Sequence, residues 1–483
     1  MNYRLVLLVL GRILVLAAAA MAPPLLVSLL YGDGVHLSFL VTMAILLVLG
    51  IPMVALMKKR EKTMRSREGF VAVALCWVAI ALFGALPPFF SGAIPNYIDA
   101  LFEMSAGFTT TGASILISVE NLPESIVFWR AFSQWLGGMG VLILTLAILP
   151  AGDRGFNNLA RAESTGLSSE RLVPRIRQSA TILYLIYLVL TVLQTLALLL
   201  GGMNLYEALI HAFATAGTGG FSSRDASVGA FNSGFIEYTI GLFMILFSVS
   251  FTLYYAAVTR EFSRIRKNTE IKVFLTIIVI STALIAADLV RNGVYSNLSD
   301  TIRHSFFHTA SLGSSTAFSV ADYNQWPGLS KTVLLCLMAI GGCAGSTAGG
   351  LKVIRIITLY KSASREIKRI IHPRSISVVH INKEPVQDKA LTGVLHFFVI
   401  YVIIVAAAVL LVSLDDMGLE TTFSSVIAMI SNVGPGFGLV GPASNYAGFS
   451  VLSKLVLSLT MFVGRLEIFP ILMLFFPSTW RRA

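Results

Sequence analysis

The strongest constraint on this chain is a series of long apolar blocks, many of which exceed the roughly 18 residues that a helix needs to cross a bilayer. Of its 483 residues, 56% are hydrophobic and 13% are charged, whereas a soluble chain carries about 25% charged residues. Strand-like alternation is rare, which argues against a transmembrane β-barrel. The first block, residues 5–30, lacks a convincing cleavage site and is expected to be a retained helix. The sequence therefore predicts an all-α polytopic membrane protein.

The basic residues lie between the apolar blocks and favour alternate connections. They gather at 58–67, 154–177, 260–272 and 352–389, and at both ends of the chain. The positive-inside rule assigns these connections, and with them both termini, to the cytoplasm. This distribution accounts for the net charge of +11, so nucleic acid is not expected as a partner. The cysteines, Cys76, Cys336 and Cys343, lie in apolar context without CxxC spacing and are expected to be small buried hydrophobes.

After two leading helices within residues 1–57, the chain repeats one design four times. Each unit has a spanning helix, a short apolar segment ending in a Gly/Ser/Thr cluster, and a second spanning helix. The units cover 69–150, 179–259, 272–371 and 390–478. Their second spans are expected at 126–150, 235–259, 329–360 and 450–476, and only the third is expected to be interrupted.

The four short segments lie on the side opposite the basic connections. A helix of about 12 residues rises only ~18 Å, which is too short to cross ~30 Å of hydrocarbon. Each segment must therefore enter the membrane and return, and irregular backbone at that depth is tolerated only where it is buried or lines a water-filled cavity. Because the same unit recurs four times, the sequence predicts four helix–pore loop–helix repeats around a pseudo-fourfold pore.

The Gly-rich turns after these segments have the composition of a potassium site. Rings of backbone carbonyls replace the water of a dehydrated K⁺ without fixed charge, and glycine permits the positive φ that such rings require. The turns at 109–112 (TTTG), 218–220 (TGG) and 432–434 (NVG) fit this chemistry. Alternatively, each glycine is a helix C-cap followed by an ordinary loop, but four such turns in register favour the pore.

At this point a family resemblance is evident. The segments FTTTGAS, GGFS, ADYNQWP, NVGPGFG and GGCAGSTAGGLK are similar to those of the TrkH subunits in the TrkH/KtrB/HKT superfamily of cation transporters, and the resemblance covers essentially the whole chain. It implies potassium uptake across a bacterial inner membrane, with K⁺ as the transported ligand and no bound cofactor. It also implies a homodimer with one pore per protomer and a cytosolic TrkA-like nucleotide-binding regulatory ring.

The resemblance also implies which residues form the selectivity filter. Three consecutive residues from each turn contribute, and they are Thr110, Thr111, Gly112, Thr218, Gly219, Gly220, Ser315, Thr316, Ala317, Asn432, Val433 and Gly434. The third set departs from the family pattern, because alanine stands where the family usually has glycine. An alanine in the left-handed region costs roughly 1 kcal/mol, so the expected consequence is an altered geometry in that quarter and altered K⁺ over Na⁺ selectivity.

A second candidate site is the Gly-rich segment at residues 341–352. It lacks the GxxxxGK[ST] order of a phosphate-binding loop and interrupts an apolar span. A flexible loop beneath the filter fits it better, although a simple helix kink is an alternative. The resemblance implies an intramembrane gate, with Gly341, Gly342, Gly345, Gly349, Gly350 and Arg465 as the gating residues.

Arg465 lies within an apolar span, where an ionisable residue is costly and usually functional. The resemblance places it beneath the filter, in contact with the Gly-rich segment. A structural pair with Glu467 is the alternative, but residues two apart do not face each other on a helix. Near the outer mouth, Glu103, Glu207 and Glu420 are expected either to attract cations or to form a solvated rim.

Two other functional classes are less well supported by the sequence. A proton- or sodium-coupled secondary cation transporter would call for paired broken helices and intramembrane acidic relays. An intramembrane enzyme would need a nucleophile and base pair or a metal cluster within the spans, and neither is found. The sequence carries no ATP-binding motif, so a nucleotide is expected only on the regulatory partner.

Overall fold

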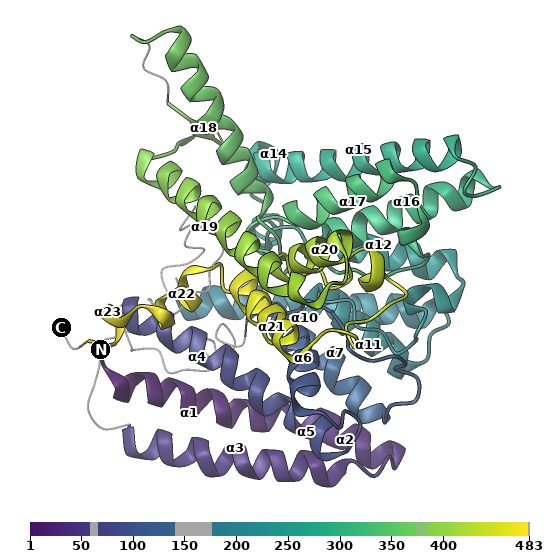
Figure 1. Ribbon diagram of the computed structural model, residues 1–483, viewed down its shortest axis with the longest axis vertical. Helices are drawn as coiled ribbons and strands as arrows, with labels where there is room; N and C mark the ends of the chain where they lie inside the picture. The colour runs from purple at the N-terminus through teal and green to yellow at the C-terminus, as the bar shows by residue number, and fades with distance from the viewer. Residues whose placement is uncertain (58–65, 141–175, 375–377, 383, 482–483) are drawn as a thin grey trace.

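The computed structural model describes residues 1–57, 66–140, 176–374, 378–382 and 384–481 (Figure 1). These residues are predominantly helical, and the strands among them are one antiparallel pair, β1 (His380–Ile381) and β2 (Glu384–Pro385). The expected all-α class is therefore confirmed. The end of the expected first unit, 141–150, and the basic stretches at 58–65 and 154–175 lie outside the described residues.

Within the described residues, six helical segments are long and apolar enough to span a membrane: Tyr3–Tyr31, His36–Met57, Arg67–Phe90, Thr181–Leu200, Thr269–Arg291 and Asp388–Asp415. Two of them lead the chain, namely α1 (Tyr3–Ala20) with α2 (Ala22–Tyr31), and α3 (His36–Met57). The pair α1 and α3 packs closely through glycine, since a side chain on Gly50 would lie 2.9 Å from the Gly11 carbonyl oxygen. Small residues at a contact allow membrane helices to approach in this way.

Each of the four units contains one short, largely buried helix. These helices are α6 (Tyr97–Phe108), α11 (Leu205–Gly217), α16 (Leu298–Gly313) and α20 (Leu419–Ile430). The first three begin at an asparagine whose side chain accepts a backbone N–H, which satisfies one exposed donor of the helix end. All four carry one acidic residue in the first turn, where it complements the helix dipole. Their carbonyl ends therefore point towards the loops that follow.

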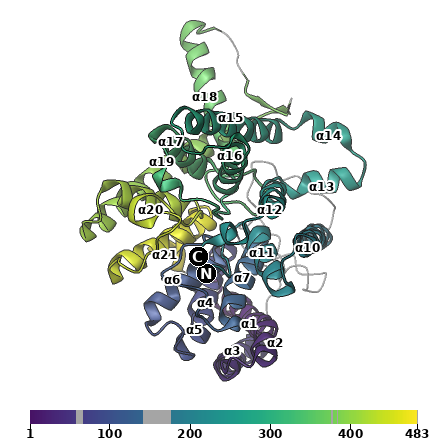
Figure 2. The same cartoon turned by 90° about the vertical axis from the view of Figure 1, so that its right-hand side faces the viewer.

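Longer helices flank each short helix. The first spans are α4 (Ser66–Gly84) with α5 (Leu86–Phe90), α10 (Ile176–Leu200), α15 (Thr269–Arg291) and α19 (Asp388–Val412). The second spans are α7 (Glu124–Gly138), α12 (Gly234–Phe247) with α13 (Phe251–Val258), α17 (Gly328–Ile340) with α18 (Val353–Ile371), and α21 (Val451–Arg465) with α22 (Phe469–Phe475). Figure 2 shows the four units following one another around a common centre, with α1–α3 outside the ring beside the first unit. This is the expected layout of two leading helices and four repeats.

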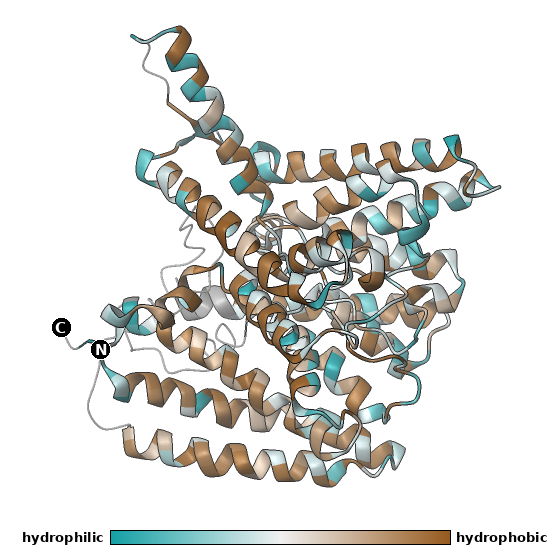
Figure 3. Ribbon diagram, viewed as in Figure 1, coloured by the Kyte–Doolittle hydropathy of each residue, from teal (hydrophilic) through white to brown (hydrophobic). Residues whose placement is uncertain are grey.

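The remaining described elements are short and lie in connections. They are α14 (Phe262–Lys267), α23 (Pro477–Trp480), η2 (Ser227–Phe231), η3 (Tyr323–Gln325), η4 (Ser413–Asp415) and η5 (Gly438–Val440). Figure 3 shows that the long helices are apolar along most of their length and polar mainly at their ends. Helix α18 differs, because polar and apolar residues mix along it as it projects from the helical body.

Two spans that were expected to be continuous are broken. The second span of unit 2 bends by 91° between α12 and α13. The last span breaks between Arg465 and Phe469, where Glu467 and Ile468 take positive φ angles of 55° and 70°. Neither break contains glycine. Each bend therefore depends on contacts with neighbouring residues and not on backbone flexibility.

Candidate ion pathway

The four expected loop triplets share one backbone conformation. In every triplet the first and third residues have positive φ: 55° and 76° for Thr110 and Gly112, 56° and 75° for Thr218 and Gly220, 58° and 61° for Ser315 and Ala317, and 52° and 99° for Asn432 and Gly434. The middle residues, Thr111, Gly219, Thr316 and Val433, are not among those with positive φ. Such alternation differs from helix and strand, in which successive residues repeat one conformation. We expect this alternation to turn successive carbonyls of one chain in a common direction.

Neighbouring triplets touch through their glycines. A side chain on Gly112 would come within 1.8 Å of the Gly219 carbonyl oxygen, and one on Gly220 would come within 2.0 Å of the Thr316 oxygen. A side chain on Gly434 would come within 2.5 Å of the Thr111 oxygen. The triplets thus abut in the order 1–2–3 and 4–1, at separations that leave no room for a methyl group.

Ala317 occupies the equivalent position in triplet 3 and carries the methyl group that the other three positions exclude. Its φ of 61° lies in the left-handed region, which costs a non-glycine residue about 1 kcal/mol. It packs against a cluster of buried residues that includes Val433 and Phe437 from the fourth unit. The contact between triplets 3 and 4 is therefore built differently from the other three.

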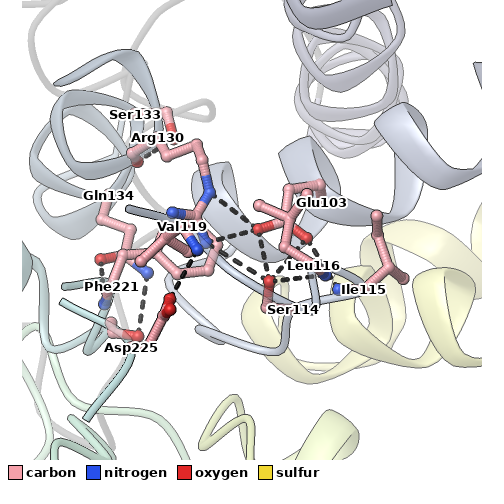
Figure 4. Close-up of polar contacts among 11 residues, drawn as sticks. Glu103, Ser114, Ile115, Leu116, Val119, Arg130, Ser133, Gln134, Phe221 and Asp225 are labelled. Atoms are coloured by element: carbon pink, nitrogen blue, oxygen red, sulfur yellow. Dashed lines mark hydrogen bonds and ion pairs between the residues drawn. The ribbon is translucent and has the colours of Figure 1, made fainter. Parts of the chain in front are cut away.

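A buried ion pair supports the loop after triplet 1 (Figure 4). The Arg130 and Glu103 side chains are 2% and 0% exposed, and their closest nitrogen and oxygen atoms are 2.6 Å apart. Glu103 also accepts hydrogen bonds from the Ser114 hydroxyl and from the Ile115 backbone N–H. The Arg130 guanidinium lies 4.1 Å from the centre of the Phe221 ring, in the loop after triplet 2. One charged pair on α6 and α7 thus orients two loops at once.

Gln134, one turn further along α7, fixes triplet 2 (Figure 4). Its amide nitrogen donates to the Gly219 carbonyl oxygen at 2.9 Å, and its amide oxygen accepts from the Phe221 N–H at 3.1 Å. A side chain on Gly219 would lie 2.3 Å from the Gln134 amide carbon. Glycine at this position therefore has a steric reason in addition to any role in ion binding.

The expectation of an acidic rim is wrong for Glu103. This carboxylate is fully buried because Arg130 and two loop donors neutralise and bind it. Glu207 is largely buried and pairs with Arg224 at 2.6 Å. Glu420 remains exposed and pairs with Lys331 at 3.2 Å. Each of the three acids lies on the short helix of its unit and forms an ion pair. Of the three, only Glu420 is exposed as a solvated rim residue would be.

The Gly-rich segment lies directly against triplets 3 and 4. The Gly349 N–H donates to the Ser315 hydroxyl oxygen at 2.6 Å. A side chain on Gly349 would come within 2.1 Å of the Ser431 carbonyl oxygen. Gly341 and Gly350 approach each other equally closely, since a side chain on Gly341 would meet the Gly350 Cα at 2.8 Å. Glycine is needed here for close backbone contact as well as for flexibility.

The same segment is bonded to the break between α12 and α13. The Cys343 N–H donates to the Ser248 carbonyl oxygen, and the Phe251 N–H donates to the Gly345 oxygen, both at 3.0 Å. These bonds satisfy backbone groups that the break would otherwise leave unpaired within the membrane. The 91° bend and the Gly-rich segment therefore stabilise each other.

A buried carboxylate anchors the Gly-rich segment. One oxygen of Glu270, at the start of α15, accepts from the Ala344 N–H at 2.7 Å and from the Ile354 N–H at 3.1 Å. Ala344 lies within the Gly-rich segment, and Ile354 lies in the first turn of α18. Glu270 thus ties the Gly-rich segment to the start of α18.

Arg465 links the end of α7 in the first unit to the Gly-rich segment of the third unit. Its guanidinium donates to the Thr347 carbonyl oxygen at 2.8 Å and to the Gly137 and Gly138 oxygens at 2.6 and 2.7 Å. Gly137 lies under triplet 1, because a side chain there would come within 1.9 Å of the Phe108 oxygen. Glu467 pairs with Arg355 on α18 instead of with Arg465, so the expectation that these neighbours do not pair agrees with the structure.

Several residues of this region escaped the sequence analysis. Arg130 and Gln134 lie on α7, Glu270 lies in the first turn of α15, and Lys352 ends the Gly-rich segment. Polar residues within apolar spans were a usable signal for Arg130 and Gln134. For Glu270 no local signal exists, since it stands beside a basic connection and looks like a solvated helix start. Among the described residues, no group of three His, Cys, Asp or Glu side chains is placed to bind a metal.

Comparisons with known proteins agree with this architecture. A family model named TrkH and described as a cation transport protein matches residues 36–481. The Trk system potassium uptake protein TrkH of Halomonas elongata is 37% identical over 485 residues, and that of Escherichia coli strain K12 is 37% identical over 489 residues, each with 100% of both chains covered. The crystal structure of the potassium transporter TrkH from Vibrio parahaemolyticus superposes with a TM-score of 0.89 at 34% identity and covers 100% of both chains. With its four loop triplets and its matching length, this chain belongs to the TrkH family of cation transport proteins.

Proposed function

We propose that this chain takes up potassium ions across a bacterial inner membrane through a pore lined by the carbonyl oxygens of the four loop triplets. The observation that carries the proposal is the alternation of φ, which is the same in all four triplets although their sequences differ. Carbonyl rings built in this way replace the hydration shell of K⁺. The potassium uptake proteins to which the chain is similar support the same ion.

The Gly-rich segment and Arg465 act as a gate in this proposal. Arg465 binds carbonyls under triplet 1 on one side and Thr347 in the Gly-rich segment on the other, while Gly349 contacts triplets 3 and 4. Together they contact the residues next to triplet 1 and those of triplets 3 and 4. A guanidinium in the path of K⁺ adds charge repulsion to the steric block.

The gate would be controlled by a cytosolic TrkA-like nucleotide-binding ring, and two copies of this chain would form a homodimer with one pore each. Helix α18 follows the Gly-rich segment directly and projects from the body of the protein (Figure 1). A regulator that moves α18 would therefore move the Gly-rich segment. The basic residues in the last turn of this helix, Lys368 and Arg369, offer it a charged surface.

The selectivity of reconstituted protein tests the proposed filter. In planar bilayers with K⁺ on one side and Na⁺ on the other, the reversal potential should report a preference for K⁺. Gly112→Ser and Gly434→Ser should each lower that preference, because the new side chains would meet the neighbouring triplet within 1.8 Å and 2.5 Å. Gly393→Ser is the matched control, since a side chain there meets no atom within 4 Å. Ion ratios that stay unchanged in both filter variants would refute the assignment.

A second candidate function is proton- or sodium-coupled cation transport. One observation favours it: the broken spans α12–α13 and α17–α18 pack against each other, and paired broken helices are a feature of secondary transporters. The two functions differ in energetics. A reversal potential for K⁺ that shifts when a pH or Na⁺ gradient is imposed at constant K⁺ indicates coupling, whereas an unchanged value indicates a channel.

A further inference from the structure

Lys352, the last residue of the Gly-rich segment, combines a buried ammonium group with a left-handed backbone conformation. Its side chain is only 5% exposed, and its ammonium donates to the Ala348 carbonyl oxygen within the same segment. Its backbone has a φ of 73°, a left-handed conformation that is strained for lysine. This strain persists because the Lys352 N–H bonds to the Ile340 oxygen and the Val353 N–H bonds to the Gly342 oxygen.

Two cations of this region, the buried Lys352 and the half-buried Arg465, bind consecutive carbonyls. Arg465 donates to the Thr347 oxygen at 2.8 Å, and Lys352 donates to the oxygen of the next residue, Ala348. The carboxylates that act on Lys352, Glu270 and Glu467, are engaged elsewhere. Glu270 accepts two backbone N–H groups, and Glu467 pairs with Arg355. The Lys352 ammonium therefore relies on a carbonyl oxygen. Arg465 also donates to carbonyl oxygens, the ligand type that K⁺ takes.

These carbonyls lie immediately below the loop triplets. Gly349, the residue after Ala348, bonds to Ser315 at the first position of triplet 3. On the opposite side, Gly137 lies against Phe108 just before triplet 1, and Gly138 lies against Gly217 just before triplet 2. An ion leaving the triplets towards the cytoplasm meets this group of oxygens next.

We propose that the carbonyl oxygens of Thr347, Ala348, Gly137 and Gly138 form a second monovalent-cation site beneath the filter, and that Lys352 occupies it as a tethered cation together with Arg465. This inference rests on the proposed potassium function and deepens it. Permeating K⁺ must displace the Lys352 ammonium from the Ala348 oxygen. Because Lys352 is joined to the first residue of α18, a movement of that helix withdraws the ammonium and frees the site.

The test is ⁸⁶Rb⁺ uptake into proteoliposomes that contain only this chain. Lys352→Met removes the charge and keeps the length of the side chain, and should raise uptake by about one to two orders of magnitude, because a unit charge that repels K⁺ leaves the path. Lys352→Arg should stay near wild type. Lys361→Met is the matched control, because Lys361 lies on the same helix α18 and also donates to one backbone carbonyl, that of His380 at 2.6 Å, but away from the triplets.

Chemical rescue separates occupancy of the site from a merely structural effect. Lys352→Ala leaves room for a small free ammonium, so ethylammonium should inhibit uptake by Lys352→Ala at concentrations that leave wild type and Lys361→Met unaffected. Gel filtration in detergent establishes that each variant is folded. Uptake at the wild-type level in both folded Met and Ala variants overturns the proposal, as does equal inhibition of all proteins by ethylammonium.

The ion ratio distinguishes failure of this site from failure of the proposed filter. Lys352 variants should change the flux at an unchanged K⁺/Na⁺ ratio, whereas Gly112→Ser and Gly434→Ser should change the ratio. If the glycine variants lose selectivity while the Lys352 variants match wild type, only the second site is wrong. If the glycine variants keep the wild-type ratio, the filter itself is wrong.

Discussion

Ala317 shows how one methyl group distinguishes this chain from a filter with four equivalent quarters. At the three glycine positions a methyl group would come within 1.8–2.5 Å of a carbonyl oxygen of the neighbouring triplet. Real Cβ atoms essentially never approach another heavy atom closer than 3.0 Å. The contact between triplets 3 and 4 must therefore be wider than the others. We expect a wider ring to discriminate less well against an ion that keeps part of its hydration shell.

Ala317→Gly should sharpen the preference for K⁺ over Na⁺, because glycine relaxes the left-handed strain and lets triplets 3 and 4 approach. The measurement is the bi-ionic reversal potential. Gly220→Ala is the reciprocal variant and should lower selectivity, since its methyl group would lie 2.0 Å from the Thr316 oxygen. A marked loss of K⁺ preference in Ala317→Gly would show that alanine is required.

Arg130 tests how much the buried pair behind triplet 1 contributes to stability. Removing one partner of a buried ion pair costs about 3–5 kcal/mol, so Arg130→Ala should lower the melting temperature in detergent by several degrees. Arg224→Ala is the control, because Arg224 pairs with Glu207 on the short helix of unit 2 but is 45% exposed. Exposed pairs contribute about 1 kcal/mol or less. Equal shifts in the two variants would contradict the proposed support of the loops by Arg130.

At the scale of elements, the break in one span depends on the break in another. Helices α12 and α13 meet at 91° only because their free backbone groups bond to the Gly-rich segment between α17 and α18. Arg465, at the end of α21, completes the same assembly through Thr347. A change in any one of these breaks is thus transmitted to the others.

Deleting residues 344–347, or replacing Arg465 with alanine, should raise K⁺ flux in the absence of a regulator. Two unit charges about 6 Å apart repel by roughly 3 kcal/mol at an effective dielectric of 20, which corresponds to about a hundredfold in rate. Uptake of ⁸⁶Rb⁺ into proteoliposomes measures this change. If both variants are folded and neither exceeds wild type, the Gly-rich segment is a structural kink and no gate.

At the scale of the whole molecule, the two ends of the chain meet. The Met1 amino group donates to the Arg481 carbonyl oxygen at 3.4 Å, and the Tyr3 hydroxyl donates to the Trp480 oxygen at 2.6 Å. Figure 1 shows both termini on the same side of the molecule. The start of α1 and the end of the last unit therefore meet at one end of the helical body.

We expect that end to be cytoplasmic, because the basic residues near the two ends of the chain, Arg4 and Arg481, lie there. Alkaline phosphatase fused to the C-terminus should then be inactive, and a green fluorescent protein at the same position should fluoresce. Phosphatase fused after Gly293, at the opposite end of α15 from its basic start, is the control and should be active. Active phosphatase at the C-terminus would reverse the orientation.

The sequence by itself determined the class of protein, the four repeats and the location of the triplets. These features depend on local properties, namely the length of apolar blocks and glycine after each short helix, which any surrounding structure has to accommodate. Ser315–Thr316–Ala317, which has no glycine, was placed in register with the other triplets through the family resemblance and the segment ADYNQWP that follows it. Its backbone has the same alternation of φ.

Only the tertiary structure decided the features that depend on distant partners. Glu103 is buried because Arg130, 27 residues away, neutralises it. The span at 235–259 breaks because the Gly-rich segment, almost a hundred residues later, supplies its hydrogen bonds. Lys352 and Arg465 bind adjacent carbonyls although they come from different units. In the membrane interior each polar group must find a partner, and which partner it finds is settled by how the helices pack.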